Sequence, residues 1–122
     1  FLCILIMSLI CKRFQTDLPP YTAESLSDEH KIPIRLTTTI LYELQDMHMI
    51  FETPVEDDEE MAYLPSVDIN RMSVAMLLSR LDREGSEAVK IDRERYYASW
   101  EALSKARNEY YESTGKILLK DL

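Results

Sequence analysis

Hydrophobic positions recur at helical spacing along most of this chain and give way once to two short runs of β type. The opening run, FLCILIMSLIC, contains one polar residue, Ser8, and predicts a helix. Asp17-Leu18-Pro19-Pro20 ends it, because proline removes a backbone donor and disfavours helical geometry in the residue before it. The run is too short to cross a membrane alone, so it predicts either a core helix or the end of a longer span. Because the chain begins with Phe1, we expect it to be part of a longer protein.

Residues 21–64 have the pattern of helix, turn, helix and β-hairpin, which is typical of a winged helix-turn-helix. Thr22 is a good N-cap for a short helix that ends near His30. The turn is Lys31-Ile32-Pro33, whose proline suits the first turn of the next helix. The second helix has one apolar stripe at spacings of four, four and three, formed by Leu36, Ile40, Leu44 and Met47.

The other side of this second helix is the candidate recognition face, since this helix could enter a DNA major groove. As a DNA reader, it would use its arginine for guanine, its threonines for phosphates and its glutamine for adenine. The alternative is a plain solvated or partner-binding face. The face consists of Arg35, Thr38, Thr39, Tyr42, Gln45 and Asp46.

Two short runs, Ile50–Thr53 and Met61–Leu64, predict the antiparallel strands of the wing. Between them, the run EDDEE at 56–60 lacks the alternating spacing and the glycine of a calcium loop, so it predicts a solvated hairpin tip. After the wing, Asp68 and Asn70 are interpreted as turn formers rather than catalytic groups.

Two further helices complete the prediction. Ser73 caps the first, which ends at Gly85 and has an inward stripe of Val74, Leu77, Leu78 and Leu81. The last helix spans about 96–113, and one of its faces carries Tyr96, Trp100, Leu103 and Tyr110. This face either packs on the domain's own core or forms a dimer interface, where tyrosine and tryptophan are enriched. The tail KILLKDL is apolar enough that it either packs or meets a partner.

The predicted fold is therefore mainly α (α+β), a winged helix-turn-helix with a two-stranded β wing and an additional C-terminal helix. Residues 1–95 would form the winged-helix domain, with the wing at about 50–64, and residues 96–122 a C-terminal amphipathic helix and tail. The net charge is −8, and residues 21–64 hold two basic against eleven acidic residues. Phosphate contacts require clustered Lys and Arg, so the charge favours a non-DNA role through protein contacts or self-association.

The sequence contains no catalytic motif, and we expect no enzyme activity, no cofactor and no metal. The histidines, His30 and His48, lie at the ends of different helices, without the spacing of a metal site. The cysteines, Cys3 and Cys11, are separated by a rise of about 12 Å along one helix, which is beyond disulfide reach. Two free thiols indicate a reducing compartment.

Three blocks resemble the C-terminal cytosolic domain of YihY/BrkB-type inner-membrane proteins, once labelled ribonuclease BN-like. They are YTAESLSDEHKIPIRLTTTILYEL, MAYLPSVDINRMSVAMLLSRLD and GSEAVKIDRE, with DINRMSV and KIDRE the most specific parts. This resemblance implies a non-catalytic module on the cytoplasmic side of a bacterial inner membrane, with membrane helices before Phe1. A nuclease would need catalytic groups upstream of this segment.

The helix-turn-helix portion also resembles Rrf2-type winged-helix repressors. That resemblance implies a DNA-binding transcriptional regulator using Arg35, Thr38, Thr39 and Gln45. In such repressors, cysteines near the wing bind an iron–sulfur cluster, whereas Cys3 and Cys11 lie in the first helix here.

Overall fold

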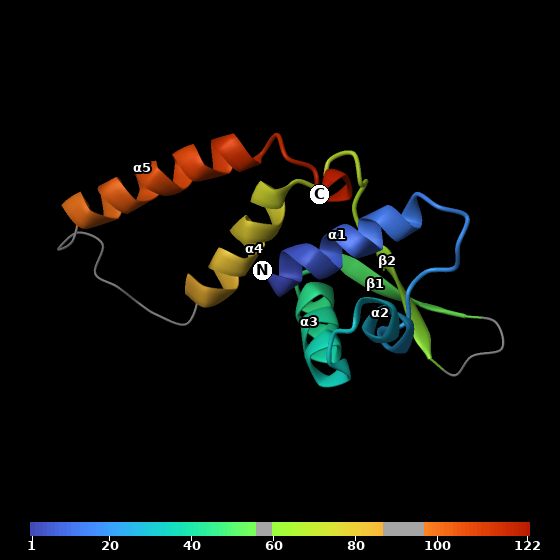
Figure 1. Cartoon of the computed structure of the whole chain (residues 1–122). Helices are drawn as coiled ribbons and strands as arrows, with labels where there is room; N and C mark the ends of the chain where they lie inside the picture. Colours follow the sequence, from blue (N-terminus) through green and yellow to red (C-terminus); the bar gives the residue numbers. More distant parts are fainter. Residues whose placement is uncertain (56–59, 87–96) are drawn as a thin grey trace. The chain divides into compact units, whose positions relative to one another are not determined.

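The computed structural model describes residues 1–55, 60–86 and 97–122, with backbone only for 84–86, 97, 99 and 100. These residues form five α-helices and a two-stranded antiparallel sheet (Figure 1). They group into two compact units: one comprises 1–72 with 118–122, and the other comprises 73–117. The predicted mainly α fold with a two-stranded wing is confirmed. The predicted division between 1–95 and 96–122 stays a prediction.

Helix α1 (Leu2–Phe14) is a core helix of the first unit. It contacts α3, β2 and the short 3-10 helix η1 (Leu119–Asp121), and its inward side chains are fully or almost fully buried. Burial of one such aliphatic side chain contributes about 1.5–3 kcal/mol, so this helix holds much of the unit together. Its buried apolar residues are Ile6, Met7, Ile10 and Cys11. Among the described residues, no helix has the length and hydropathy needed to span a membrane.

Helix α2 (Ala23–His30) begins at the predicted cap. The Thr22 hydroxyl accepts a hydrogen bond from the Ser25 amide at 3.1 Å, and the Ser25 hydroxyl accepts one from the Thr22 amide at 2.9 Å. This reciprocal capping box satisfies two amide donors that the first turn leaves open. Lys31 ends the helix in the left-handed region, with φ 54°, and so makes the sharp turn toward the next helix.

Helix α3 (Ile34–Asp46) follows Pro33 directly, as predicted, but its buried face is rotated from the predicted one. Leu36 is 38% exposed, whereas Thr37 is fully buried and donates its hydroxyl hydrogen to the Pro33 carbonyl at 3.1 Å. A buried threonine is tolerated because this bond satisfies its hydroxyl inside the helix. The residues that α3 buries are Thr37, Ile40, Leu41 and Leu44.

The wing consists of β1 (Ile50–Pro54) and β2 (Met61–Pro65), which pair from Ile50 opposite Pro65 to Pro54 opposite Met61. Each strand is one residue longer than predicted. The segment before α2 extends this sheet, because the Tyr63 amide donates to the Tyr21 carbonyl at 2.9 Å. The wing is thus tied directly to the start of the helix-turn-helix.

Arg13, in the last turn of α1, fixes the loop that leads to α2. Its guanidinium lies 4.5 Å from the centre of the Tyr21 ring, and its Nε donates to the Pro19 carbonyl at 2.7 Å. Its terminal nitrogen also lies 3.7 Å from a Glu29 carboxylate oxygen. One side chain therefore joins α1, the proline-containing loop and α2.

The second unit is an antiparallel pair, α4 (Val74–Ser86) and α5 (Tyr97–Thr114). The Val74 amide donates to the Ile117 carbonyl at 2.8 Å, and further along α4 the Asp82 carboxylate contacts Tyr111 and Arg107 of α5. The predicted end of α4 at Gly85 is wrong, since the helix continues to Ser86.

The chain end returns to the first unit. Leu119 of η1 is fully buried, and its amide donates to the Met72 carbonyl at 3.0 Å. Leu119 of the tail therefore packs in the core of its own chain, whereas Ile117 and Leu122 remain 43% and 44% exposed. The expectation that the tail packs or meets a partner is met by Leu119. The predicted cap of α4 is also confirmed, because the Ser73 hydroxyl accepts a hydrogen bond from the Met76 amide at 3.2 Å.

Candidate nucleic-acid interface

The outward face of α3 is the candidate interface. The structure brings Arg35, Thr38, Thr39 and Tyr42 to the solvent side of the helix, with Tyr42 71% exposed, and leaves Gln45 half-buried at the edge. Side chains three and four positions apart on a helix are neighbours, so these residues form one continuous surface. Their role in binding stays a prediction.

Charge divides this face into two halves. The N-terminal half, residues 34–42, contains no carboxylate, and the exposed cations Lys31 and Arg35 both lie at its beginning. The exposed acids Glu43 and Asp46 lie in the other half. Because the N-terminus of a helix also carries partial positive charge, the first two turns of α3 favour an anion and the last turn disfavours one.

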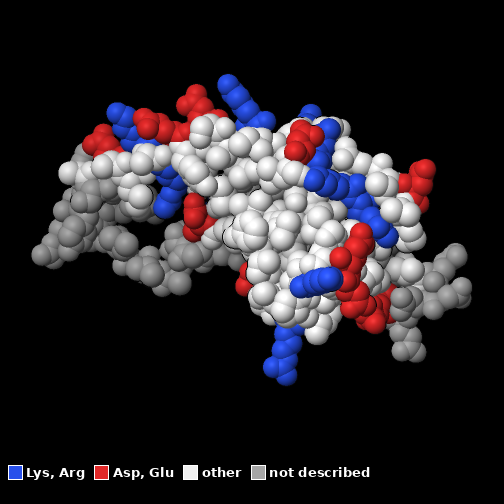
Figure 2. Space-filling model, in the orientation of Figure 1, with Lys and Arg blue, Asp and Glu red and all other residues white. Residues whose placement is uncertain are grey.

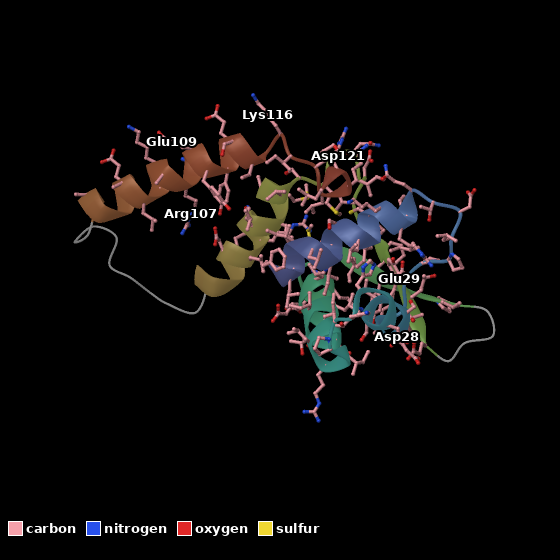
Figure 3. All side chains as sticks on the ribbon, viewed as in Figure 1. Asp28, Glu29, Arg107, Glu109, Lys116 and Asp121 are labelled. Carbon is pink, nitrogen blue, oxygen red and sulfur yellow. The ribbon has the colours of Figure 1, made fainter. Side chains whose placement is uncertain are left out.

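Further acidic residues lie on α2 and on the wing, the elements before and after α3 in the chain. Asp28 and Glu29 project from α2 (Figure 3), and the corresponding part of the surface is red (Figure 2). At the wing tip, Glu56–Glu59 lie outside the described residues, and Glu60 is half-buried. The first turns of α3 are therefore a small non-acidic area on an acidic domain.

The hydroxyls of the two exposed threonines are turned back onto the helix. Thr38 donates to the Ile34 carbonyl at 2.8 Å, and Thr39 donates to the Arg35 carbonyl at 2.9 Å. A phosphate accepts hydrogen bonds and donates none, so each threonine would have to leave its helix partner to bind one. In the observed arrangement, the γ-methyl is the branch of each side chain that is left for outside contact.

Two aliphatic residues on this face were missed in the sequence. Ile34 is 49% exposed and Leu36 is 38% exposed, on either side of Arg35. The apolar stripe predicted from the sequence left out Leu41. With Leu41 included, Thr37, Ile40, Leu41 and Leu44 have the spacing i, i+3, i+4, i+7 that is typical of one buried helix face. Leu36 does not belong to this set of positions, so the spacing would have predicted that Leu36 is exposed.

A groove lies where the C-terminal half of α3 meets the wing. It combines two carboxylates with an aromatic ring, which is a lining that suits a cationic side chain and repels phosphate. The residues that line it are Tyr42, Gln45, Asp46, His48 and Glu52. Within the described part of the chain, no three His, Cys, Asp or Glu side chains are arranged to hold a metal ion.

The remaining candidates have structural roles. His30 Nε2 lies 3.1 Å from the Tyr21 hydroxyl, where burial raises the pKa of the tyrosine. The Asp68 carboxylate accepts hydrogen bonds from the Asn70 amide at 2.9 Å and side chain at 3.1 Å, which confirms the turn interpretation. An iron–sulfur cluster does not fit this donor set, because Cys3 and Cys11 are the only cysteines and such clusters are held by about four ligands.

We expect the thiols to react slowly with the disulfide reagent DTNB at neutral pH. Burial raises the pKa of Cys11 to about 12, and burial followed by the Glu43 carboxylate raises the pKa of Cys3. The thiolate is the nucleophile, so a raised pKa lowers the reactive fraction. In the variant Cys3→Ser, the remaining thiol should react at least about tenfold faster after unfolding in urea. Equal absorbance rates in folded and unfolded protein would contradict this.

Of the candidate interface residues on α5, Leu103 is 50% exposed and Tyr110 is 51% exposed. They are seven residues apart and so share one side of the helix. Tyr96 lies outside the described residues, and of Trp100 only the backbone in α5 is described. Their role as an interface stays a prediction.

The chain is thus a winged helix-turn-helix domain with a long additional helix. Among solved structures, it resembles IscR of T. potens, with a TM-score of 0.66 and 14% identity over 98% of this chain and 79% of that one. It also resembles CymR, the global cysteine regulator of B. subtilis, with a TM-score of 0.66 and 14% identity over 98% of this chain and 88% of that one. For CymR of Staphylococcus aureus, the TM-score is 0.60 at 13% identity, over 97% and 88%. No protein-family profile and no curated protein matches the chain.

The resemblance to YihY/BrkB inner-membrane proteins is wrong, because the structures that match are Rrf2-family transcription regulators. The predicted location at an inner membrane depended on that resemblance and is wrong with it. The physical reason is that the matching residues do common structural work: Asp68 and Asn70 form a turn, and Ser73 caps a helix. Such residues recur in unrelated folds. The KIDRE stretch, residues 90–94, lies outside the described residues.

Proposed function

We propose that this chain is an Rrf2-type transcription regulator that binds duplex DNA through the first two turns of α3. The observation that carries the proposal is Arg35, an exposed arginine in the first turn of the second helix of a helix-turn-helix. In such motifs, the N-terminal residues of this helix contact base edges in the major groove. The likeness in fold to regulators along 98% of the chain supports the same assignment.

The acidic net charge is compatible with this function because of where the charges lie. Lys31 and Arg35 are the two basic residues of segment 21–64, and both lie at the end of α3 that would enter the groove. The described acids of the segment lie on α2, on the last turn of α3 and in or next to the two wing strands, and Glu56–Glu59 lie outside the described residues. The net charge of residues 21–64 favoured a non-DNA role in the sequence analysis. A net charge does not take into account that the basic and acidic residues lie at different places.

We further propose that the chain acts as a homodimer, with the exposed side of α5 at Leu103 and Tyr110 as part of the contact. Rrf2-type regulators are often dimeric, and dimers with this motif read two half-sites about one helical turn apart. A dimer doubles the number of phosphate contacts, which matters for a protomer with few basic residues near the groove.

A salt titration of DNA binding tests the function. Fluorescence anisotropy with a duplex pool of random sequence should show binding at low salt that weakens as salt is added. On a random duplex, where Arg35 has no preferred guanine, Lys31 and Arg35 would both contact phosphates, and about two such contacts predict a slope of log K against log salt near −2 per protomer. Absence of binding at the lowest salt concentration would refute the proposal.

Replacement of Arg35 by alanine should weaken binding to the preferred duplex about tenfold or more, because a bidentate arginine–guanine contact is lost. The matched control is Lys12→Ala, which removes the same charge from an exposed position in the last turn of α1. Anisotropy titrations of both variants at one salt concentration decide the matter. An equal loss in the two would mean that only overall charge is involved.

A protein-contact role is the second candidate, and the groove at Tyr42, Asp46 and Glu52 is the observation that favours it. Its two carboxylates and aromatic ring would accept a lysine or arginine of a partner protein. A chain that fails to bind DNA but loses a protein partner on Asp46→Asn would establish this role in place of the first.

A further inference from the structure

The first two turns of α3 present a largely apolar surface around a single arginine. Residues 34–41 read IRLTTTIL, and Arg35 is the only charged residue among them. Ile34 and Leu36, on either side of it, are 49% and 38% exposed although burial of aliphatic groups is favourable. About half of the Ile34 surface and about two fifths of the Leu36 surface therefore remain open to a ligand.

The two exposed threonines extend this apolar surface. Thr38 and Thr39 donate their hydroxyl hydrogens to the Ile34 and Arg35 carbonyls, at 2.8 Å and 2.9 Å. Each Cβ carries one hydroxyl and one methyl, so with the hydroxyl hydrogen bonded to the helix the side chain offers a ligand its methyl group and an acceptor oxygen, but no donor. The third threonine, Thr37, is fully buried and cannot contribute.

In the major groove, the C5-methyl of thymine is the apolar group that the base edges display. We propose that this surface, formed by Ile34, Leu36, Thr38 and Thr39 around Arg35, recognises thymine methyl groups flanking a guanine. The inference rests on the proposed DNA-binding function and specifies the half-site: two or more thymines, at positions next to a guanine bound by Arg35.

The charge of the helix limits how far the reading extends. Glu43 and Asp46 are exposed in the last turns of α3, where phosphates would repel them. The N-terminal turns therefore enter the groove and the C-terminal turn stays outside it. We therefore expect a short half-site that is recognised mainly through apolar contacts, and not a long half-site that is recognised through hydrogen bonds.

The experiment begins with selection from a 20-base-pair duplex pool of random sequence, using the full chain. The selected duplex is then synthesised with deoxyuridine in place of thymine, which removes only the methyl groups and keeps base pairing. We expect affinity to fall about three- to fourfold for each methyl contacted, the effect of burying one methyl group. Deoxyuridine outside the selected half-site should have no effect.

The variants Ile34→Ala and Leu36→Ala connect the effect to the helix. Both residues are exposed, so the fold should be retained, and circular dichroism would verify this. Each variant should reduce the difference in affinity between the thymine and deoxyuridine duplexes, whereas Lys12→Ala should leave that difference unchanged.

The outcomes separate the two proposals. Enrichment of a duplex that binds equally well with deoxyuridine would overturn methyl recognition and leave DNA binding intact. Failure to enrich any duplex, together with no binding at low salt, would overturn the DNA-binding function and this inference with it.

Discussion

Leu41→Ala should lower the free energy of unfolding by about 3 kcal/mol, because it removes a fully enclosed aliphatic side chain and leaves a cavity. Leu41 is 1% exposed in the middle of α3, where it shares the buried side with Ile40 and Leu44. For a domain of this size, the midpoint of thermal unfolding should fall by roughly 10 °C. Urea unfolding followed by circular dichroism measures the change.

Leu36→Ala is the matched control, because it makes the same chemical change in the same helix. Helix propensity changes equally in both variants, so their difference reports burial alone. Leu36 is 38% exposed, and its loss should cost less than about 1 kcal/mol. The apolar stripe predicted from the sequence gives the reverse order, with Leu36 in the core. A larger loss for Leu36→Ala than for Leu41→Ala would show that the observed orientation of α3 is wrong.

Features that depend on short-range chemistry could be predicted from the sequence. Thr22 and Ser73 cap their helices because a hydroxyl at that position bonds an amide three residues later, whatever the rest of the chain does. The wing strands were predicted within one residue, since each is a short β-type run ending at a proline, Pro54 or Pro65. These local rules were sufficient for the fold class.

The orientation of α3 could not be obtained in the same way. Thr37 and Leu36 are adjacent, and hydropathy alone favours burial of the leucine. Burial of Thr37 becomes acceptable only because its hydroxyl bonds the Pro33 carbonyl, a contact that a count of apolar residues does not include. The recognition face predicted from the sequence therefore included the polar residues of the exposed side but not Ile34 and Leu36.

The total charge of residues 21–64 is a poor guide to DNA binding for a related reason. Interaction between charges depends on separation, and screening in physiological salt limits it to about 8 Å. A total over residues 21–64 gives equal weight to Arg35 and to acids on the wing. Along α3 itself, the structure separates the two kinds of charge. Lys31 and Arg35 lie at the N-terminal end of the helix, and Glu43 and Asp46 lie at its C-terminal end.

Introducing a charge on the exposed side of α5 should break the proposed homodimer. Leu103 and Tyr110 are about half exposed, although each has a large apolar surface to bury. If they meet a second copy, Leu103→Glu places an unpaired carboxylate in the contact, which costs about 3 kcal/mol or more. The dissociation constant of the dimer should rise at least about 100-fold, as measured by sedimentation velocity over a range of concentrations.

Asn108→Glu is the control for this change, since it adds the same carboxylate at an exposed position of α5 on another side of the helix. It should leave the dimer intact. Because two half-sites are bound together only by a dimer, Leu103→Glu should also weaken binding to a palindromic duplex far more than to a single half-site. A wild-type chain that sediments as a monomer at every concentration would rule out the dimer. In that case Leu103 and Tyr110 would be surface residues, and a regulator with only two basic residues in segment 21–64 would have to bind its DNA as a single protomer.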